Sequence, residues 1–365
     1  MSLKSRLWRR LDDAIAAAST PLQAATLRAQ RAALMARHGR EPQAREELTA
    51  LHLLAFQSPN PKLSAWLHLA EGLTSYFSDL GAGADEKLLR AEAAAKSLQL
   101  TELEALCAAW LAYLAFVRHD IDALVAHAAV AQRLAQLEDH GARGRLAITL
   151  AIAHDFAGSP TAPAWYAEAR RHASADGDDA SQSALIYNMT AMRVAQLRQE
   201  RLGSPARPVP EQLLGADSVA HYDAAVDVAL LPNLTPLLRA QLLVLQGDYA
   251  HAQALYAEHL PLARARGLAR LGSSLLAEVA WCRVNLGEAE LGLQQAQDAE
   301  LELDLATDCD DRAVTLSRLA QVYGALGRDE QAQAFAERAA AEWLEVRAQQ
   351  AAWAQALKAP GLAKP

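Results

Sequence analysis

The side chains of this sequence that could do chemistry stand apart from one another along the chain. His251 and His259 are eight residues apart, about 12 Å along a helix, which is too far for both to bind one metal ion. The acidic stretch DLATDCDDR, which begins at Asp304, lacks the glycine and the twelfth-position glutamate of a calcium loop. The adjacent Asp310 and Asp311 lack the further acid of the D-D-x-x-D motif found in some all-α enzymes. We therefore expect no metal site.

Motifs of the common enzyme and nucleotide-binding classes are also missing. The sequence has no H-E-x-x-H zinc motif, no G-x-x-x-x-G-K-[ST] phosphate loop and no G-x-S-x-G nucleophile elbow. Catalysis by side chains needs such a constellation, because one group must activate another within hydrogen-bond reach. We therefore expect a protein that is not an enzyme and that uses no cofactor.

The net charge, the cysteines and the apolar runs limit the kinds of partner and the cellular compartment that we expect for this chain. A net charge of -8 repels a phosphate backbone, so we expect no nucleic acid among its partners. Cys107, Cys282 and Cys309 form no C-x-x-C pair, which favours buried thiols in a reducing compartment. Charges interrupt every apolar run, so we expect no membrane span and a cytoplasmic protein.

A turn that recurs about every forty residues indicates how the chain is built. Gly247, Gly287 and Gly327 each follow an alanine- and leucine-rich amphipathic run, which is typical of a helix. A small residue stands seven positions before each glycine and another stands five positions after it. Close packing of a helical hairpin requires such small residues, and glycine ends a helix without steric cost. Similar turns are expected near Gly39, Gly81, Asp120, Gly158 and Gly203.

The repeat predicts an all-α chain of about eight antiparallel helix hairpins, since each hairpin needs a stacked neighbour to complete its core. Three prolines at positions 205, 208 and 210 interrupt the pattern. We expect N-terminal repeats at 1–202, a Pro-rich loop between helices at 203–217, and C-terminal repeats with a capping helix at 218–365. The loop either joins two helices of one continuous solenoid or acts as a hinge between two lobes.

The first helix carries an apolar stripe with basic residues around it. Leu7, Leu11 and Ile15 lie on that stripe, and Arg9 and Arg10 lie beside it. We expect this helix to cap the repeat array, because a terminal repeat helix must be amphipathic. The alternative is that it lies on an anionic membrane surface.

The last repeat resembles the tetratricopeptide-repeat (TPR) family. The resemblance rests on large, small and aromatic packing residues, Leu316, Leu319, Ala320, Tyr323, Gly327, Ala332 and Ala339. The period is longer than the usual repeat of about thirty-four residues. It is similar to the longer-helix repeats of maltose-activator-like bacterial regulators and peptide-sensing bacterial receptors, and HEAT-type repeats have a similar period. The resemblance implies a right-handed α-solenoid with a superhelical binding surface.

In repeats of this kind the first helix of each hairpin lines the concave face. Positions about six residues before the turns, with neighbours on the same helical face, are therefore candidates for partner contacts. Aromatic and arginine side chains dominate binding hot spots. Asparagine is a poor helix former, so its presence in a helix indicates a role for its amide, and the resemblance to peptide-sensing receptors implies that this amide binds a peptide backbone. We expect partner contacts at Trp110, Tyr113, Asn188, Arg193, Gln241, Glu278, Trp281, Arg318 and Gln321. The alternative is that the tryptophans belong to the core.

These expectations combine into a non-enzymatic, TPR-like scaffold that binds a protein or peptide partner on its concave face. The alternative is a regulatory sensor of a ligand or peptide. Ligand binding would then change the pitch of the superhelix, and the sensor would act on a separate transcriptional or signalling effector.

Overall fold

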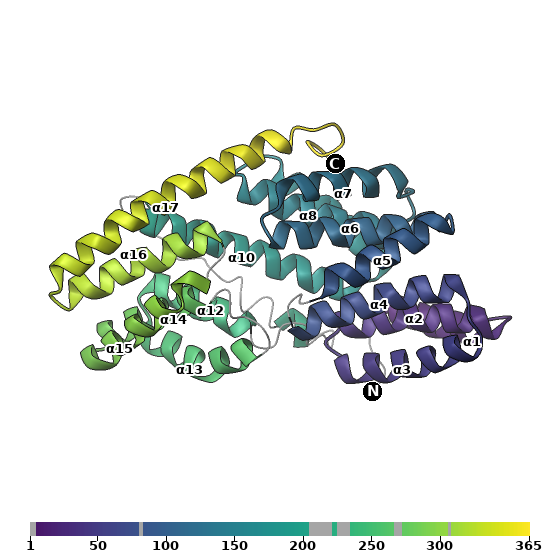
Figure 1. The fold of residues 1–365 in the computed structure, drawn as a ribbon, viewed down its shortest axis with the longest axis horizontal. Coiled ribbons are helices and arrows are strands. Elements are labelled where there is room, and N and C mark those ends of the chain that lie inside the picture. Colours follow the sequence, from purple (N-terminus) through teal and green to yellow (C-terminus); the bar gives the residue numbers. More distant parts are fainter. Residues whose placement is uncertain (1–4, 80–82, 204–220, 225–233, 266–271, 306–307) are drawn as a thin grey trace. The chain divides into compact units, whose positions relative to one another are not determined.

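The computed structural model describes residues 5–79, 83–203, 221–224, 234–265, 272–305 and 308–365. Every regular element within these ranges is a helix, which confirms the all-α prediction (Figure 1). No helix in the described part of the chain is long and apolar enough to cross a membrane. The Pro-rich loop predicted at 203–217 lies outside the described residues, apart from Gly203 at the end of a helix.

The chain divides into two compact units, which are described separately. Unit 1 contains Met1–Ile186, Ala220–Leu231 and Trp353–Pro365, and unit 2 contains Tyr187–Val219 and Pro232–Ala352. The helices of unit 1 are α1 (Arg6–Ala16), α2 (Pro21–Arg37), α3 (Glu41–Gln57), α4 (Pro61–Asp79), α5 (Ala84–Ser97), α6 (Thr101–Val117), α7 (Ile121–Leu134), α8 (His140–Phe156) and α9 (Ala162–Asp176). Those of unit 2 are α12 (Leu234–Gln246), α13 (Tyr249–Ala265), α14 (Gly272–Asn285), α15 (Ala289–Leu301), η2 (Leu303–Leu305) and α16 (Cys309–Ala325). Both α10 (Asp179–Gly203) and α17 (Asp329–Ala356) contribute residues to the two units.

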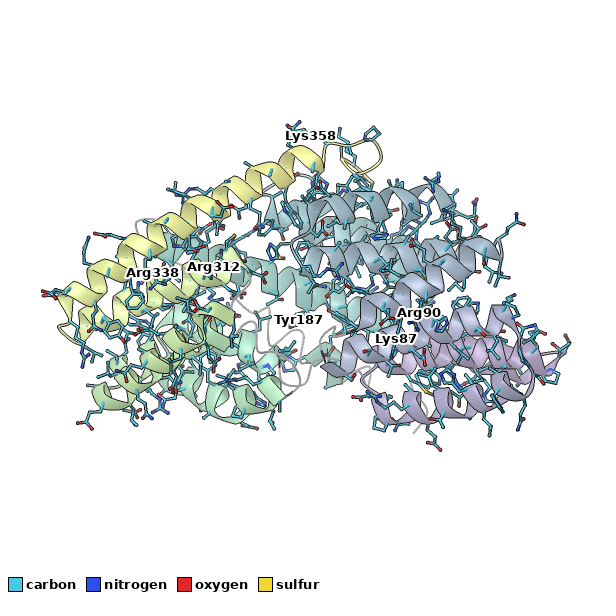
Figure 2. All side chains as sticks on the ribbon, viewed as in Figure 1. Lys87, Arg90, Tyr187, Arg312, Arg338 and Lys358 are labelled. Atoms are coloured by element: carbon cyan, nitrogen blue, oxygen red, sulfur yellow. The ribbon has the colours of Figure 1, made fainter. Side chains whose placement is uncertain are left out.

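Consecutive helices pack as hairpins within each unit. In unit 1, α2 packs on α3, α4 on α5, α6 on α7 and α8 on α9, and α2 also packs on α4 and α6 on α8. In unit 2, α12 packs on α13, α14 packs on α15 and also on α16, and an ion pair from Arg312 (labelled in Figure 2) to Glu342 joins α16 to α17. Within each unit, hairpins therefore stack on their neighbours. The count of eight hairpins and the handedness of the array remain predictions.

The recurring turn has the predicted left-handed backbone. The φ angles of Gly247, Gly287 and Gly327 are 84°, 83° and 70°, and the amide of Arg328 donates to the Tyr323 carbonyl at 2.9 Å. This bond closes the helix end in the way that requires a left-handed residue. At the turn before Asp120 the left-handed residue is not a glycine but His119, with φ of 56°.

The small residues around the turns are where the helices come closest. Ala240, Ala252 and Ala280 are fully buried. A Cβ atom added at Gly292 would lie 2.6 Å from Cγ2 of Val284, so no larger residue fits there without movement. The cysteines are free and buried, as expected. The pattern of small residues thus predicted helix contacts correctly at these positions.

The C-terminal segment packs within unit 1, which the repeat pattern did not predict. Trp353 contacts Phe116 on α6 and Phe156 on α8, with ring centroids 5.5 and 5.0 Å apart. The Leu362 carbonyl oxygen lies 2.8 Å from Nε2 of His154. These contacts join residues that are about two hundred or more positions apart in the sequence.

The left-handed turn and the helix before it make a matched pair of test sites. Gly327→Ala should lower the free energy of unfolding by about 1 kcal/mol, because a Cβ atom disfavours positive φ. Gly324→Ala, inside α16, should raise stability by up to about 1 kcal/mol, since its new Cβ atom would lie at an ordinary 3.7 Å from Ala332. Urea unfolding followed by circular dichroism measures the free energy of unfolding of both variants. Equal changes in that free energy at the two sites would contradict the left-handed turn at Gly327.

Candidate functional site

Aromatic side chains in unit 1 form a cluster around an arginine. Trp110 packs edge-on against Phe77 and Tyr113, with ring centroids 6.0 and 5.9 Å apart. The Tyr113 hydroxyl lies 2.9 Å from the hydroxyl of Tyr76 on α4. The Arg145 guanidinium, from α8, lies over the Trp110 ring at 3.7 Å from its centroid. Trp110 is buried and Tyr113 is half-buried, so Trp110 contributes to the core, as the alternative interpretation expected.

A cavity of about 370 Å³ adjoins this cluster. It is lined mainly by α1, α2, α4, α6 and α8. Close packing joins α2 to α4 and α6 to α8, whereas large aromatic side chains join α4 to α6. The apolar part of its wall comprises Leu7, Leu11, Leu27, Leu34, Trp66, Leu69, Leu73, Leu106 and Trp110. Its size and lining are typical of a pocket for a small ligand.

The apolar stripe of α1 faces this cavity, since Leu7 and Leu11 belong to its wall. The start of α1 is held on the turn after α9, where the Leu7 amide donates to the Gly177 carbonyl at 3.1 Å. Arg31, on α2, donates to Asp12 at 2.7 Å. The first helix therefore packs on the repeats of unit 1, as the capping interpretation predicted.

Two arginines of the cavity wall are paired with neighbouring acids. Arg10 forms an ion pair with Asp176. Arg37 forms an ion pair with Asp178 and donates to the Ser181 hydroxyl at 2.7 Å. Burial alone would raise the pKa of Asp178, but Arg37 and the donors of Ser181 outweigh burial and lower that pKa. Both guanidinium groups are therefore committed to partners within the protein.

Arg145 is the third arginine of the cavity wall, and its environment differs. Only 5% of the residue is exposed, and its Nε has no hydrogen-bond partner. No residue in the described ranges accepts a hydrogen bond from its guanidinium or forms an ion pair with it. Burial and the nearby charge of Arg37 lower its pKa to about 10, so the group still carries its charge at neutral pH.

Besides Asp176, three further carboxylates line the cavity, namely Glu102, Glu138 and Asp139, and the polar lining also includes Gln30, His140 and Ser181. Burial raises the pKa of Glu102, and the neighbouring Asp139 raises it further. The Asp139 carboxylate accepts a hydrogen bond from the Gln136 amide at 2.7 Å. The cavity thus has apolar walls, several acids and one arginine with no acceptor among the described residues.

Unit 2 contains a buried network of three charged side chains. Arg198 Nη2 lies 3.2 Å from one Glu278 oxygen, and Arg318 Nε lies 3.2 Å from the other. The second contact is an ion pair without hydrogen-bond geometry. Arg318 also donates to Gln321 at 2.7 Å and lies over the Trp281 ring, 5.7 Å from its centroid. The network connects α10, α14 and α16.

The structure thus brings together four of the predicted contact residues, Glu278, Trp281, Arg318 and Gln321. In the described part of the chain, no hydrogen bond or ion pair links the other three predicted residues of unit 2 to them. Asn188 and Gln241 are half-buried, on α10 and α12, and Arg193 is exposed on α10. Arg193 donates at 3.5 Å to Gln196, one turn along its own helix.

Sequence reasoning missed two arginines of these sites, although a signal for each was present. Arg145 lies seven residues before Ile152, two helical turns away, on the face expected to look inward. Arg198 directly follows Leu197, another inward position. Arginine is almost never fully buried without a partner, so an arginine at an inward position is a candidate for a group that pairs within the protein or with a ligand. That requirement could have identified both residues.

The described residues offer little for metal or thiol chemistry. None of their His, Cys, Asp and Glu side chains form a group of three or more that could hold a metal ion. Burial raises the pKa of the Cys282 thiol to about 12 and that of Cys309 to about 11. Both thiols are therefore protonated at neutral pH, and a thiolate is the reactive form.

Comparison with known proteins adds no relative to this description. No protein-family model matches the chain, and no curated protein matches it.

The buried network of unit 2 should be essential to its stability. Glu278→Gln leaves two buried guanidinium groups without a carboxylate, so unfolding free energy should fall by about 3–5 kcal/mol. Glu337→Gln on α17 is the control, because Glu337 is exposed and its change should cost less than about 0.5 kcal/mol. Denaturant midpoints of the two variants would be compared with the parent, and a Glu278→Gln loss below about 1 kcal/mol would contradict this role.

Proposed function

We propose that this chain is a non-enzymatic helical-repeat protein that binds a protein or peptide partner through the first helices of its hairpins. The binding surface would include the first-helix row of unit 2, which we define as Gln241, Trp281 and Gln321. These residues take equivalent places before three successive turns, on α12, α14 and α16. A partner chain that runs across the three helices could contact each of them in turn.

The observation that carries the proposal is that all three side chains of the first-helix row are half-buried. A fully buried side chain at these positions could not contact a partner. A fully exposed side chain would lose more rotamer freedom on binding than a half-buried one. Trp281 packs edge-on against Tyr249, with ring centroids 6.4 Å apart, and Arg318 lies over its ring. A tryptophan held in this way, with part of its surface still accessible, has the properties of a binding hot spot.

The buried network of Arg198, Glu278 and Arg318 stabilises the helices that carry the first-helix row. Glu278 lies three residues before Trp281 on α14, and Arg318 lies three residues before Gln321 on α16. Their ion pair therefore fixes the two helices beside the row. A surface that is already ordered loses little conformational entropy when a partner binds.

A second candidate function is the regulatory sensor, which the cavity of unit 1 favours. A pocket of about 370 Å³ between stacked helices suits a small ligand better than a folded partner. A ligand that fills the space between α4 and α6 would alter how those two helices pack. The two functions are compatible, because the row and the cavity belong to different units.

Trp281→Ala should weaken partner binding by about thirtyfold or more, the effect of a hot spot of about 2 kcal/mol. The matched control is Leu291→Ala on the second helix α15, where the leucine is 47% exposed. The parent and both variants would be used for affinity capture from the source cell, and the retained protein would then be titrated against each. Equal affinity of all three chains, with folding confirmed by circular dichroism, would exclude the first-helix row.

A further inference from the structure

We propose that the cavity of unit 1 is a binding site for a small, apolar monocarboxylate whose carboxylate pairs with Arg145. The inference goes beyond the proposed partner-binding function, because it concerns a different ligand and a different unit. It rests on the cavity, on the burial of Arg145 and on the absence of an acceptor for its guanidinium among the described residues.

The geometry around Arg145 leaves its hydrogen-bonding edge available. A guanidinium group carries five N–H donors in its plane, and stacking on an aromatic ring uses the face of that plane. Arg145 lies 3.7 Å from the Trp110 centroid and 5.3 Å from that of Tyr113. The faces of these rings interact with the positive charge but accept no hydrogen bond from the donors in the guanidinium plane. Burying a charge costs free energy unless the charge is paired. An acceptor bound in the cavity would therefore offset the desolvation cost of the Arg145 guanidinium.

A carboxylate is the acceptor that suits this position. Its two oxygens match the guanidinium fork and can accept two parallel hydrogen bonds. A phosphate monoester carries a charge of roughly -1.5 to -2 at neutral pH, and Glu102, Glu138 and Asp139 on the same wall would repel it more strongly. A singly charged carboxylate is therefore favoured over a phosphate.

The other residues of the cavity wall indicate the chemistry of the part of the ligand that is not its carboxylate. Seven leucines and Trp66 form the largest apolar part of the lining, so the rest of the ligand should be apolar. A cavity of about 370 Å³ has room for about a dozen non-hydrogen atoms, at roughly 30 Å³ for each. An arylalkanoic acid or a medium-chain fatty acid has this size and this chemistry.

The test uses the full chain and a matched pair of probes, phenylbutanoate and its neutral amide phenylbutanamide. The two have the same shape and size and differ in charge. Isothermal titration calorimetry should show that the acid binds roughly ten- to a hundredfold more tightly than the amide, as expected for charge-assisted hydrogen bonds. Decanoate should also bind, whereas phenylbutyl phosphate should bind more weakly than phenylbutanoate.

Four variants test whether the preference for the acid arises in the cavity. Arg145→Met removes the donors but keeps an apolar side chain of similar length, so acid and amide should bind with equal affinity. Leu106→Trp fills the cavity and should weaken both probes, while Arg170→Met, at an exposed position on α9, should leave the preference unchanged. If Leu106→Trp does not fold, the comparison of Arg145→Met with Arg170→Met decides alone. Trp281→Ala should bind the acid normally, which separates this test from that of the partner surface.

The proposal is overturned if the parent binds none of the acids, if it binds acid and amide equally, or if Arg145→Met keeps the preference. A last arm compares a short peptide that ends in a free leucine carboxylate with the same peptide amidated at its end. Binding of the free peptide alone, through Arg145 and without binding of the small acids, would replace the small ligand with a peptide terminus and also overturn the proposal.

Discussion

A single helical hairpin cannot bury both of its faces, and the structure of each unit follows from this constraint. The apolar side left uncovered by one hairpin must be covered by the next, so the same turn and the same small residues recur along the chain. Ala240 and Ala280 are fully buried at equivalent places in successive repeats of unit 2. Gly292 leaves no room for a Cβ atom at the corresponding contact after the turn. Close approach of the helices then determines which side chains lie between neighbouring hairpins.

The two units treat buried arginines differently, and the difference indicates different roles. In unit 2, Glu278 lies between Arg198 and Arg318, so each guanidinium group has a carboxylate oxygen beside it. In unit 1, Arg145 has aromatic rings beside it and lines a cavity, with no hydrogen-bond acceptor among the described residues. The network of unit 2 stiffens the helices that it joins. The unused donors of Arg145 instead leave binding energy available to a ligand.

Local features of the chain were predictable from the sequence because they depend on neighbouring residues. The turns at Gly247, Gly287 and Gly327 require the left-handed backbone that glycine adopts, and the structure shows it. His119 takes the same conformation without being a glycine, and only the spacing of the repeat indicated a turn there. Periodicity could not reveal the packing of Trp353 in unit 1, because that contact joins distant parts of the chain.

The candidate site was predictable only in part for the same reason. The spacing of the turns placed Glu278, Trp281, Arg318 and Gln321 on inward positions, and their mutual contacts follow from stacking α14 on α16. Arg198 joins them from α10, eighty positions before Glu278, across a segment that interrupts the repeat. The cavity is lined by residues from α1, α2, α4, α6 and α8, and aromatic side chains lie between α4 and α6. Sequence spacing alone does not predict how closely these five helices approach one another.

We propose that the first helices of the hairpins present the surface that a partner contacts. The most direct measurement places a photo-crosslinking amino acid at Gln241 or Gln321 in the first-helix row, and at Leu291 on α15 for comparison. After irradiation in the source cell, we predict that the same partner protein is attached at positions 241 and 321 and not at 291. Attachment at 291 alone, or at none of the three in a folded chain, would show that the first helices do not form the partner surface.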